Sequence, residues 1–449
     1  MSLQKGNNPI KKRDFLEIDW SKIPYVFYLI MLFLISRLPL LNLGFGYDSD
    51  AWRMANTAYD LRYFHIYHTS RFPGFPIPEF LNSLVINYGW TGTNALTMIF
   101  SLISVIFFAK ILSALNVKRK GLLVLTYNFF PLLWINSTNT MGYMWALAFI
   151  IISWYSILKK RFILAGVMFG IATGCRITST ILIFPFLYLI FTESKNWKHM
   201  LYFFLSFIIV SLVFFTPLIA RYNLGFLKYY PHKVKIKDVF FKFINKFGIL
   251  TLITGGLFSL TSMRAFFRNI AKKDKDSIFL LSSIIIFFLL FLKAPYEVEY
   301  FIPAIPFGLI LINKIWRKEL TIIFSLFLMS NAVVEVNVGN FTGEGIVTKS
   351  IQERRGQIRF THHLLNAKVK AHSVVIVGYW VPTVVYFKKV TKGENNDIHY
   401  IYSASSEKIN ELHKNGYNIY YLGMMRDYTK RVYGYDLNDL NCKHLRVYK

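Results

Sequence analysis

The sequence predicts a polytopic α-helical membrane protein, with about eleven transmembrane helices followed by a small C-terminal α/β domain. The chain has 449 residues, of which 54% are hydrophobic, and it contains 43 Phe and 28 Tyr. Soluble domains are usually less apolar. Apolar runs of about 20 residues, the length that spans a bilayer, recur along most of the chain. The last part of the chain instead alternates short β-like runs with a helical one.

The expected spans define a membrane domain over residues 1–335. The first apolar run, 23–43, lacks a small-residue cleavage motif, so we expect it both to target and to anchor the chain. The stretch 162–193 is open to a second interpretation, as one bent helix plus a re-entrant turn. The spans are 23–43, 92–115, 121–136, 140–158, 162–175, 177–193, 199–219, 247–261, 277–293, 299–313 and 319–335.

The net charge of +28 would suggest nucleic acid in a soluble protein. Here Lys and Arg lie mainly between apolar runs, where the positive-inside rule and anionic lipid explain them. We therefore expect membrane lipids and no nucleic acid as partners. Bias toward Lys, Asn and Ile indicates an AT-rich genome and a prokaryotic cell (inner) membrane.

The basic loops also predict the orientation, with the N-terminus and its Lys11–Arg13 run in the cytoplasm. Loops at 116–120, 159–161, 193–199, 262–276 and 313–319 then fall inside, and each carries cations. The outer side receives the long loop 44–91, the segments 136–140, 175–176, 220–246 and 293–300, and the tail from 336. The stretch 221–246 breaks the rule: either the topology slips there or its cations have a function.

The tail, residues 336–449, is expected to form the non-cytoplasmic α/β domain. "HSVVIVGYW" (372–380), "DIHYIYS" (397–403) and "YNIYYLG" (417–423) are typical of strands. "SEKINELHKNG" predicts a helix capped by Ser405 or Ser406 and ended by Gly416. The single glycine in "VVIVGYW" excludes a dinucleotide fingerprint.

Two aspartates follow the first span, in "GFGYDSDAWRMANTAYDL" from Gly44. Asp48 and Asp50 fit N-terminal caps of an amphipathic helix lying along the interface. They also fit a general base or metal ligand at the membrane face, which takes a proton from an acceptor hydroxyl while a lipid phosphate leaves. One aspartate can cap the helix while the other acts as the general base or metal ligand.

This arrangement resembles the GT-C class of integral-membrane glycosyltransferases, such as protein O-mannosyltransferases and aminoarabinose transferases. The likeness covers roughly residues 20–330. It rests on the acidic pair in the first outer loop, on the Pro-rich "SRFPGFPIPEFL", on the Gly-rich "LAGVMFGIATGCRITSTILIFPFLYLI", and on the late "KAPYEVEYFIPAIPFGLILI". The resemblance implies an inverting enzyme that moves a sugar from a polyprenyl-phosphate donor to a lipid, glycan or protein acceptor outside the cytoplasm. Asp50 would be the base, with Asp48 as second choice.

One departure bears on a metal ion. Several of these families carry a second acidic residue where this chain reads "NSTNTMGYMWA" (136–146), which has no carboxylate. A divalent metal is therefore left open, and Asp48, Glu79, Glu297 or Glu299 are the carboxylates that could replace the missing one. The Trp-Trp-Asp signature of oligosaccharyltransferases is also absent from the tail, which argues against peptide N-glycosylation.

A lipid-linked phosphate near the headgroup plane needs cationic partners. The candidates are Arg53, Arg71, Arg176, Arg221 and Lys293. Arg176 interrupts a long apolar stretch, although snorkelling to the interface would also explain it.

Glu297, Glu299 and Tyr300 in the late motif are expected to bind sugar hydroxyls or the lipid headgroup. The two glutamates face the same way if the chain is extended, and a helix N-terminal charge pair is the alternative. Two other functions stay open: a transporter or flippase of a lipid-linked sugar, which needs polar groups at mid-membrane, and a non-catalytic membrane scaffold.

Overall fold

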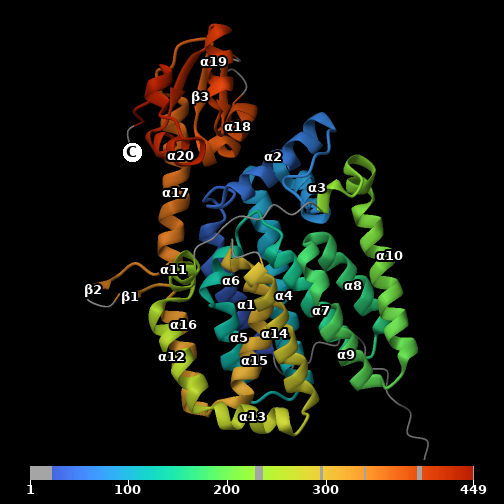
Figure 1. Ribbon diagram of the computed structural model, residues 1–449. Coiled ribbons are helices and arrows are strands. Elements are labelled where there is room, and N and C mark those ends of the chain that lie inside the picture. Colours follow the sequence, from blue (N-terminus) through green and yellow to red (C-terminus); the bar gives the residue numbers. More distant parts are fainter. Residues whose placement is uncertain (1–22, 228–235, 294–296, 338–339, 392–396, 448–449) are drawn as a thin grey trace, which may run out of the picture.

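The computed structural model describes residues 23–227, 236–293, 297–337, 340–391 and 397–447. Apolar helices form its body, and an α/β unit stands above them (Figure 1). Among the described residues, five helical stretches are long and apolar enough to cross a membrane. They are Pro76–Ala114 (α3, Pro76–Val85; η3, Ile86–Tyr88; α4, Gly89–Ala114), Ile177–Ser194 (η4, Ile177–Leu182; α9, Ile183–Ser194), α10 (Trp197–Tyr222), α14 (Lys275–Lys293) and Val298–Ile315 (η6, Val298–Ala304; α15, Ile305–Ile315).

The outward faces of these helices are apolar, as lipid-facing surfaces are. On α10, Ile209, Leu212 and Val213 are largely exposed. Inside the bundle, Trp154, Phe108 of α4, Phe169 of α8, and Phe203 and Phe207 of α10 belong to one core, and Trp145 packs in a smaller neighbouring cluster. This distribution is that of a helical membrane protein with several spans.

The expected count of eleven spans is not confirmed. A sixth span arises only if α11 (Ile236–Phe247) and α12 (Ile249–Thr261), bent by 95° at their junction, are taken together. The expected span 121–136 is split into α5 (Lys120–Asn128) and α6 (Pro131–Asn136), because a proline disfavours helical geometry in the residue before it. The remaining short or amphipathic helices are α1 (Ile23–Arg37), η2 (Leu38–Leu40), α2 (Ser49–Phe64), α7 (Tyr143–Leu158), α8 (Phe162–Cys175), η5 (Gly225–Leu227), α13 (Met263–Ala271) and α16 (Lys318–Ser330).

Glycines on one face of α8 bring it close to α10. Gly166 and Gly170 lie one turn apart, and a Cβ on Gly166 would come within 2.2 Å of the Phe203 carbonyl oxygen. Small residues at this spacing let membrane helices approach closely. At 14 residues, α8 is about 21 Å long, shorter than the hydrocarbon core, and it ends at Cys175 just before Arg176. The packing therefore holds Arg176 at the end of a tightly fixed helix.

The predicted α/β tail is confirmed. β3 (Ser373–Ile376), β4 (Ile398–Ile401) and β5 (Asn418–Tyr421) lie where strands were expected. With β6 (Lys443–His444) they form a parallel sheet in the order β4-β3-β5-β6. Ser405 caps the predicted helix, accepting a hydrogen bond from the Lys408 amide at 3.3 Å. The helices of this unit are α18 (Val381–Val390), α19 (Ser406–Lys414) and α20 (Gly423–Tyr433), with the short turns η7 (Gly378–Trp380) and η8 (Leu437–Leu440).

Two elements join the tail to the helical body. A hairpin of β1 (Glu335–Asn337) and β2 (Asn340–Thr342) is followed by α17 (Ile346–Leu365), which rises to the sheet (Figure 1). Residues of α18 pack along α2: Phe387 contacts Trp52, and Asn56 donates to the Pro382 carbonyl at 2.8 Å. The tail thus lies directly on the first long loop.

Candidate functional site

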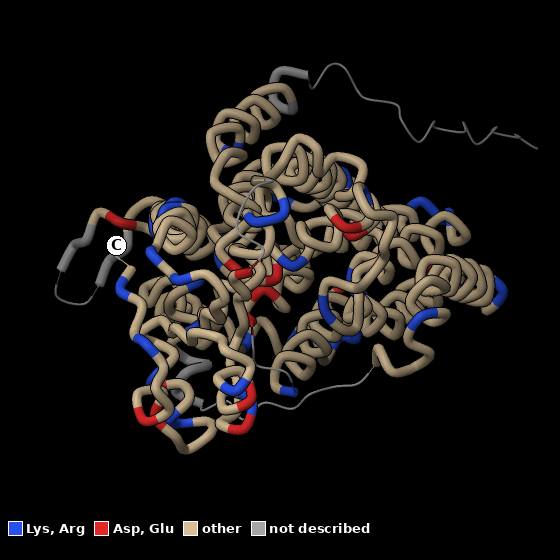
Figure 2. Tube along the Cα trace, turned by 90° about the horizontal axis from the view of Figure 1, so that it is seen from above, with Lys and Arg blue, Asp and Glu red and all other residues tan. Residues whose placement is uncertain are grey.

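Three carboxylates meet at one end of the helical body. Asp48, Asp50 and Glu297 each offer an oxygen, and these oxygens lie within 4.8 Å of one another. Seen from above, acidic positions gather near the middle of the molecule (Figure 2). Asp48 is the N-cap of α2 and accepts from the Asp50 amide at 2.9 Å, as the capping interpretation predicted. Asp50 lies in the first turn of α2 and is buried, and Glu297 immediately precedes η6.

Arg71 connects the first loop to the late motif. Its Nη1 donates to Asp50 and lies 3.5 Å from Glu297 Oε1. Arg53 Nη1 pairs with the other oxygen of Asp50 at 3.2 Å. Both oxygens of Asp50 are therefore engaged by arginines, whereas Asp48 keeps more of its capacity to accept.

Arg176 lies beside this cluster. Its guanidinium stacks 3.6 Å from the ring centroid of Tyr143 and also faces Tyr300 at 5.7 Å. The Tyr143 hydroxyl donates to Glu297, which links the stacked arginine to the acidic cluster. Arg176 is only 5% exposed, and its Nη1 is buried without a hydrogen-bond partner among the described residues. A buried guanidinium N–H with no partner is a donor available to a ligand.

Glu79 does not join the acidic cluster. It is fully buried and accepts hydrogen bonds from the Tyr67 hydroxyl at 2.8 Å, from the Ser70 amide at 2.8 Å and from the Ser70 hydroxyl at 2.7 Å. Thr69 adds a fourth at 3.2 Å. This carboxylate thus fixes the segment that carries Arg71.

Arg221 also supports that segment. It donates to the Tyr67 carbonyl oxygen from the end of α10. Of the remaining candidates, Glu299 pairs with Lys246 at 3.0 Å, and Lys293 is exposed at the end of α14. Of the two interpretations of this pair, the structure shows the helix N-terminal one: Glu297 is the N-cap of η6, and Glu299 lies in its first turn, facing Lys246 of α11. The structure thus brings Asp48, Asp50, Arg53, Arg71, Arg176, Glu297 and Tyr300 together, while Arg221 and Glu299 serve neighbouring contacts.

The tail holds the first loop from behind. Arg354 of α17 is 2% exposed and donates to the Leu43, Gly44 and Thr138 carbonyls at 3.1, 2.9 and 3.0 Å. On the next turn, Gln357 accepts from the Trp52 indole at 3.1 Å. Trp52 is fully buried, so it packs in the core and does not offer a sugar-stacking surface. The start of α2, and with it the acidic pair, is fixed by the C-terminal domain.

A second ionic contact joins the tail to α2. Lys389 lies 2.7 Å from Asp60, which also binds His68 at 2.7 Å. His68 Nδ1 lies 3.3 Å from the Thr57 hydroxyl. His68 is thus part of the packing between loop, α2 and tail.

Burial and mutual repulsion separate the proton affinities of the cluster. Burial and the neighbouring Glu297 raise the pKa of Asp48 to about 7, against the lowering effect of Arg71. Burial also acts to raise the pKa of Glu297, but Arg71 and the Tyr143 hydroxyl outweigh it, so that this pKa is lowered. Asp48 is therefore the member of the pair that takes up a proton as the pH falls through about 7, while Glu297 stays ionised.

The donor set of this cluster fits a hard divalent cation, since Mg²⁺ and Mn²⁺ prefer carboxylate oxygens. Asp48 and Glu297 supply the carboxylates that the 136–146 segment lacks. Arg71 contacts two of the three and already provides positive charge there.

Comparison of the chain with protein-family models, with curated proteins and with solved structures finds no match.

Three contributing residues were missed by the sequence analysis. Tyr143 lies in an apolar helix, where a tyrosine is typical of the aromatic belt. Lys246 is one of several lysines in the basic stretch 221–246, and no local pattern distinguishes it from the others. Arg354 lies in "SIQERRGQIRF", whose charges suggest a solvated helix face. Only their contacts reveal their roles.

Proposed function

We propose that this protein is an inverting, GT-C-type glycosyltransferase that takes its sugar from a polyprenyl-phosphate carrier. The observation that carries the proposal is the convergence of Asp48, Asp50, Arg71, Arg176 and Glu297 at one end of apolar helices. It combines proton acceptors with a buried, unsatisfied arginine, as transfer from a lipid phosphate requires.

In this proposal Asp48 takes the proton of the acceptor hydroxyl. The acceptor oxygen forms a bond to the anomeric carbon from the face opposite the phosphate, and the bond from that carbon to the phosphate oxygen breaks. Asp48 suits the role because its pKa of about 7 matches a working pH near neutrality. Asp50 is then the second choice, which reverses the order implied by the resemblance, because arginines occupy both of its oxygens.

Arg176 is the proposed partner of the leaving phosphate. Its free N–H can donate to a phosphate oxygen while the Tyr143 ring holds the guanidinium plane. A divalent ion, if bound, would be held by Asp48, Asp50 and Glu297 and would supply further neutralisation of phosphate charge. The proposal also includes a site that faces away from the cytoplasm and an acceptor that is a lipid, a glycan or a protein.

The test uses the full chain in proteoliposomes with polyprenyl-phosphate sugars, following release of polyprenyl phosphate with and without EDTA. Asp48→Asn should lower the rate by roughly 10²–10⁴-fold, the usual contribution of a positioned base. Glu193→Gln is the matched control, because Glu193 pairs with Lys275 at 2.6 Å away from the cluster. Comparing glycans by mass spectrometry between cells with and without the gene would identify the acceptor.

Two results would overturn the proposal. Movement of the intact lipid-linked sugar across the bilayer, without release of polyprenyl phosphate, would identify a flippase. Full cellular function of both Asp48→Asn and Asp50→Asn would identify a scaffold.

A further inference from the structure

A cavity of about 390 Å³ lies between helix ends at the far side of the molecule from the acidic cluster. The acidic cluster lies near the N-terminal ends of α4 and α15, whereas the cavity is lined by residues that follow or end these helices, including Leu115 and Asn313. With 26 residues, α4 is about 39 Å long, so the two sites are separated by about the thickness of a membrane. The basic loops predict this end to be cytoplasmic.

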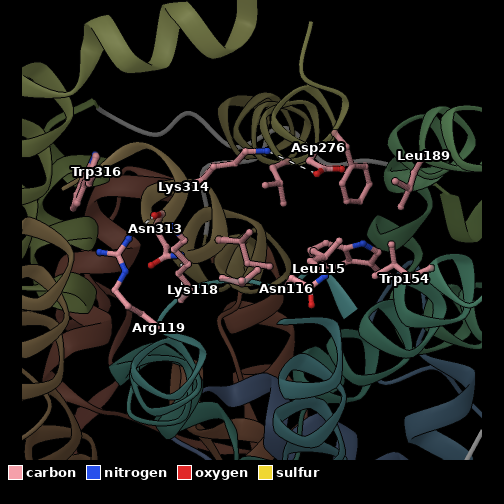
Figure 3. Close-up of a pocket in the computed structure, with 15 residues that line it drawn as sticks. Leu115, Asn116, Lys118, Arg119, Trp154, Leu189, Asp276, Asn313, Lys314 and Trp316 are labelled. Atoms are coloured by element: carbon pink, nitrogen blue, oxygen red, sulfur yellow. Dashed lines mark hydrogen bonds and ion pairs between the residues drawn. The ribbon is translucent and has the colours of Figure 1, made fainter. Parts of the chain in front are cut away.

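The cavity has an apolar wall and a cationic rim (Figure 3). Leu115, Leu158, Leu189, Leu280 and Ile310 contribute to the wall. The rim carries three cations and one carboxylate: Lys118, Arg119, Lys314 and Asp276.

The cations differ in how far they are neutralised. Lys314 is paired with Asp274 at 2.6 Å and with Asp276 at 3.8 Å. Within the described part of the chain, no ion pair involves Lys118 or Arg119. The positive charge of these two residues is therefore available to an occupant.

Several buried polar atoms that line the cavity lack partners among the described residues. Arg119 donates from Nη2 to the Asn313 carbonyl at 2.8 Å, but its Nη1 is buried and unsatisfied. Asn313 Oδ1 is an unsatisfied acceptor, and the Trp154 indole N–H is an unsatisfied donor on a side chain that is 1% exposed. Leaving such groups unpaired is costly, so these atoms indicate that the cavity holds polar partners: an acceptor such as a phosphate oxygen for Arg119, and a hydroxyl or water for Asn313 and Trp154.

We propose that this cavity binds the phosphate headgroup of an anionic membrane phospholipid. The phosphate oxygens would accept from Arg119 and face Lys118, and the upper acyl chain would lie along the leucine wall. Basic pockets between transmembrane helices suit such headgroups. A cavity that joins apolar wall to cationic rim at a helix end matches the polar–apolar junction of a phospholipid. The proposal does not depend on glycosyl transfer.

The test is a native mass-spectrometry titration of the detergent-solubilised full chain with phosphatidylglycerol, phosphatidylcholine and inorganic phosphate. We expect phosphatidylglycerol to bind more tightly than phosphatidylcholine, and inorganic phosphate not to displace it. Lys118→Gln and Arg119→Gln should each weaken phosphatidylglycerol binding by roughly fivefold, the effect of one basic residue at an anionic surface. Lys120→Gln is the matched control, since Lys120 belongs to the same basic loop but does not line the cavity.

Three outcomes would overturn the proposal. Equal weakening by all three variants would indicate general surface charge. Equal binding of the two lipids would exclude headgroup recognition, and displacement by inorganic phosphate would identify a free-phosphate site. Lys118 is exposed and makes no ion pair with the described residues, so Lys118→Gln keeps the test valid even if Arg119→Gln fails to fold.

Discussion

Asp48 and Glu297 face each other: an oxygen of one carboxyl group lies within 4.8 Å of an oxygen of the other, and each side chain shifts the pKa of its neighbour. One belongs to the first loop and the other to the segment before η6, so the contact joins the two ends of the helical body's sequence. Because the pKa of Asp48 is raised and that of Glu297 is lowered, the ionisation of Asp48 can be followed separately in a pH titration.

Asp48 should make both activity and stability depend on pH. Its pKa is raised from 3.8 to about 7, so the carboxylate that accepts a proton becomes populated only as the pH rises through about 7. We expect polyprenyl phosphate release, measured in EDTA, to rise through that range. The folded state binds more protons than the unfolded state between about 4 and 7, so the free energy of unfolding should fall as the pH rises across that window. Asp48→Asn should reduce this slope, and the raised pKa of Glu353 contributes to what remains of it.

Glu297→Gln should move the midpoint of that pH profile to lower pH. The substitution removes the carboxylate that, after burial, does most to raise the pKa of Asp48. Glu299→Gln is the comparison, because Glu299 has a smaller effect in the same direction. Equal shifts for the two variants, read from pH–rate profiles, would contradict the assigned contact.

Arg71→Gln should disable the site and destabilise the fold. Removing the guanidinium leaves Asp50 and Glu297 without their shared partner, and loss of one member of a buried ion pair costs about 3 kcal/mol. Loss of such an electrostatic contact lowers kcat by roughly 100-fold. Thermal unfolding and polyprenyl phosphate release are the measurements. Arg62→Gln, at an exposed position near the end of α2, should change neither.

Glu79→Gln should loosen the segment that carries Arg71. The variant cannot accept all four hydrogen bonds from Tyr67, Thr69 and Ser70, and the loss of charge-assisted bonds costs about 2 kcal/mol. We expect faster proteolysis between residues 65 and 75 and lower activity, with the pH midpoint of the remaining activity unchanged. A shifted midpoint would instead place Glu79 in the acidic cluster.

Arg354→Gln should reduce stability although Arg354 lies in the C-terminal domain. The variant removes the donor to the buried carbonyls of Leu43 and Thr138, which costs about 3 kcal/mol in total, whereas the Gly44 carbonyl still accepts from Asn94 at 2.8 Å. The neighbouring Arg355 is exposed on the same helix, so Arg355→Gln is the control. Unchanged thermal unfolding of Arg354→Gln would show that the tail does not hold the first loop.

Much of the local structure follows from the sequence. The apolar runs lie close to α4, α7, α8, α10, α12 and α14, because a hydrophobic stretch in lipid must satisfy its own backbone by forming a helix. The strands of the tail and the Ser405 cap were likewise predictable from short-range patterns. Spans were harder to count, since a proline or an arginine inside an apolar run breaks the helix without changing its composition much.

In the candidate site, too, some features follow from the sequence and others depend on tertiary contacts. The sequence by itself determined that Asp48 and Asp50 begin an amphipathic helix, and that Arg71, Arg176 and Glu297 lie near the ends of apolar segments. Only the tertiary structure decided that Glu297 meets the aspartates, that Glu79 and Glu299 turn away to other partners, and that Arg354 reaches in from the tail. The physical reason is range: caps and helices arise from neighbours along the chain, whereas ion pairs and shifted pKa values depend on how distant helices pack together.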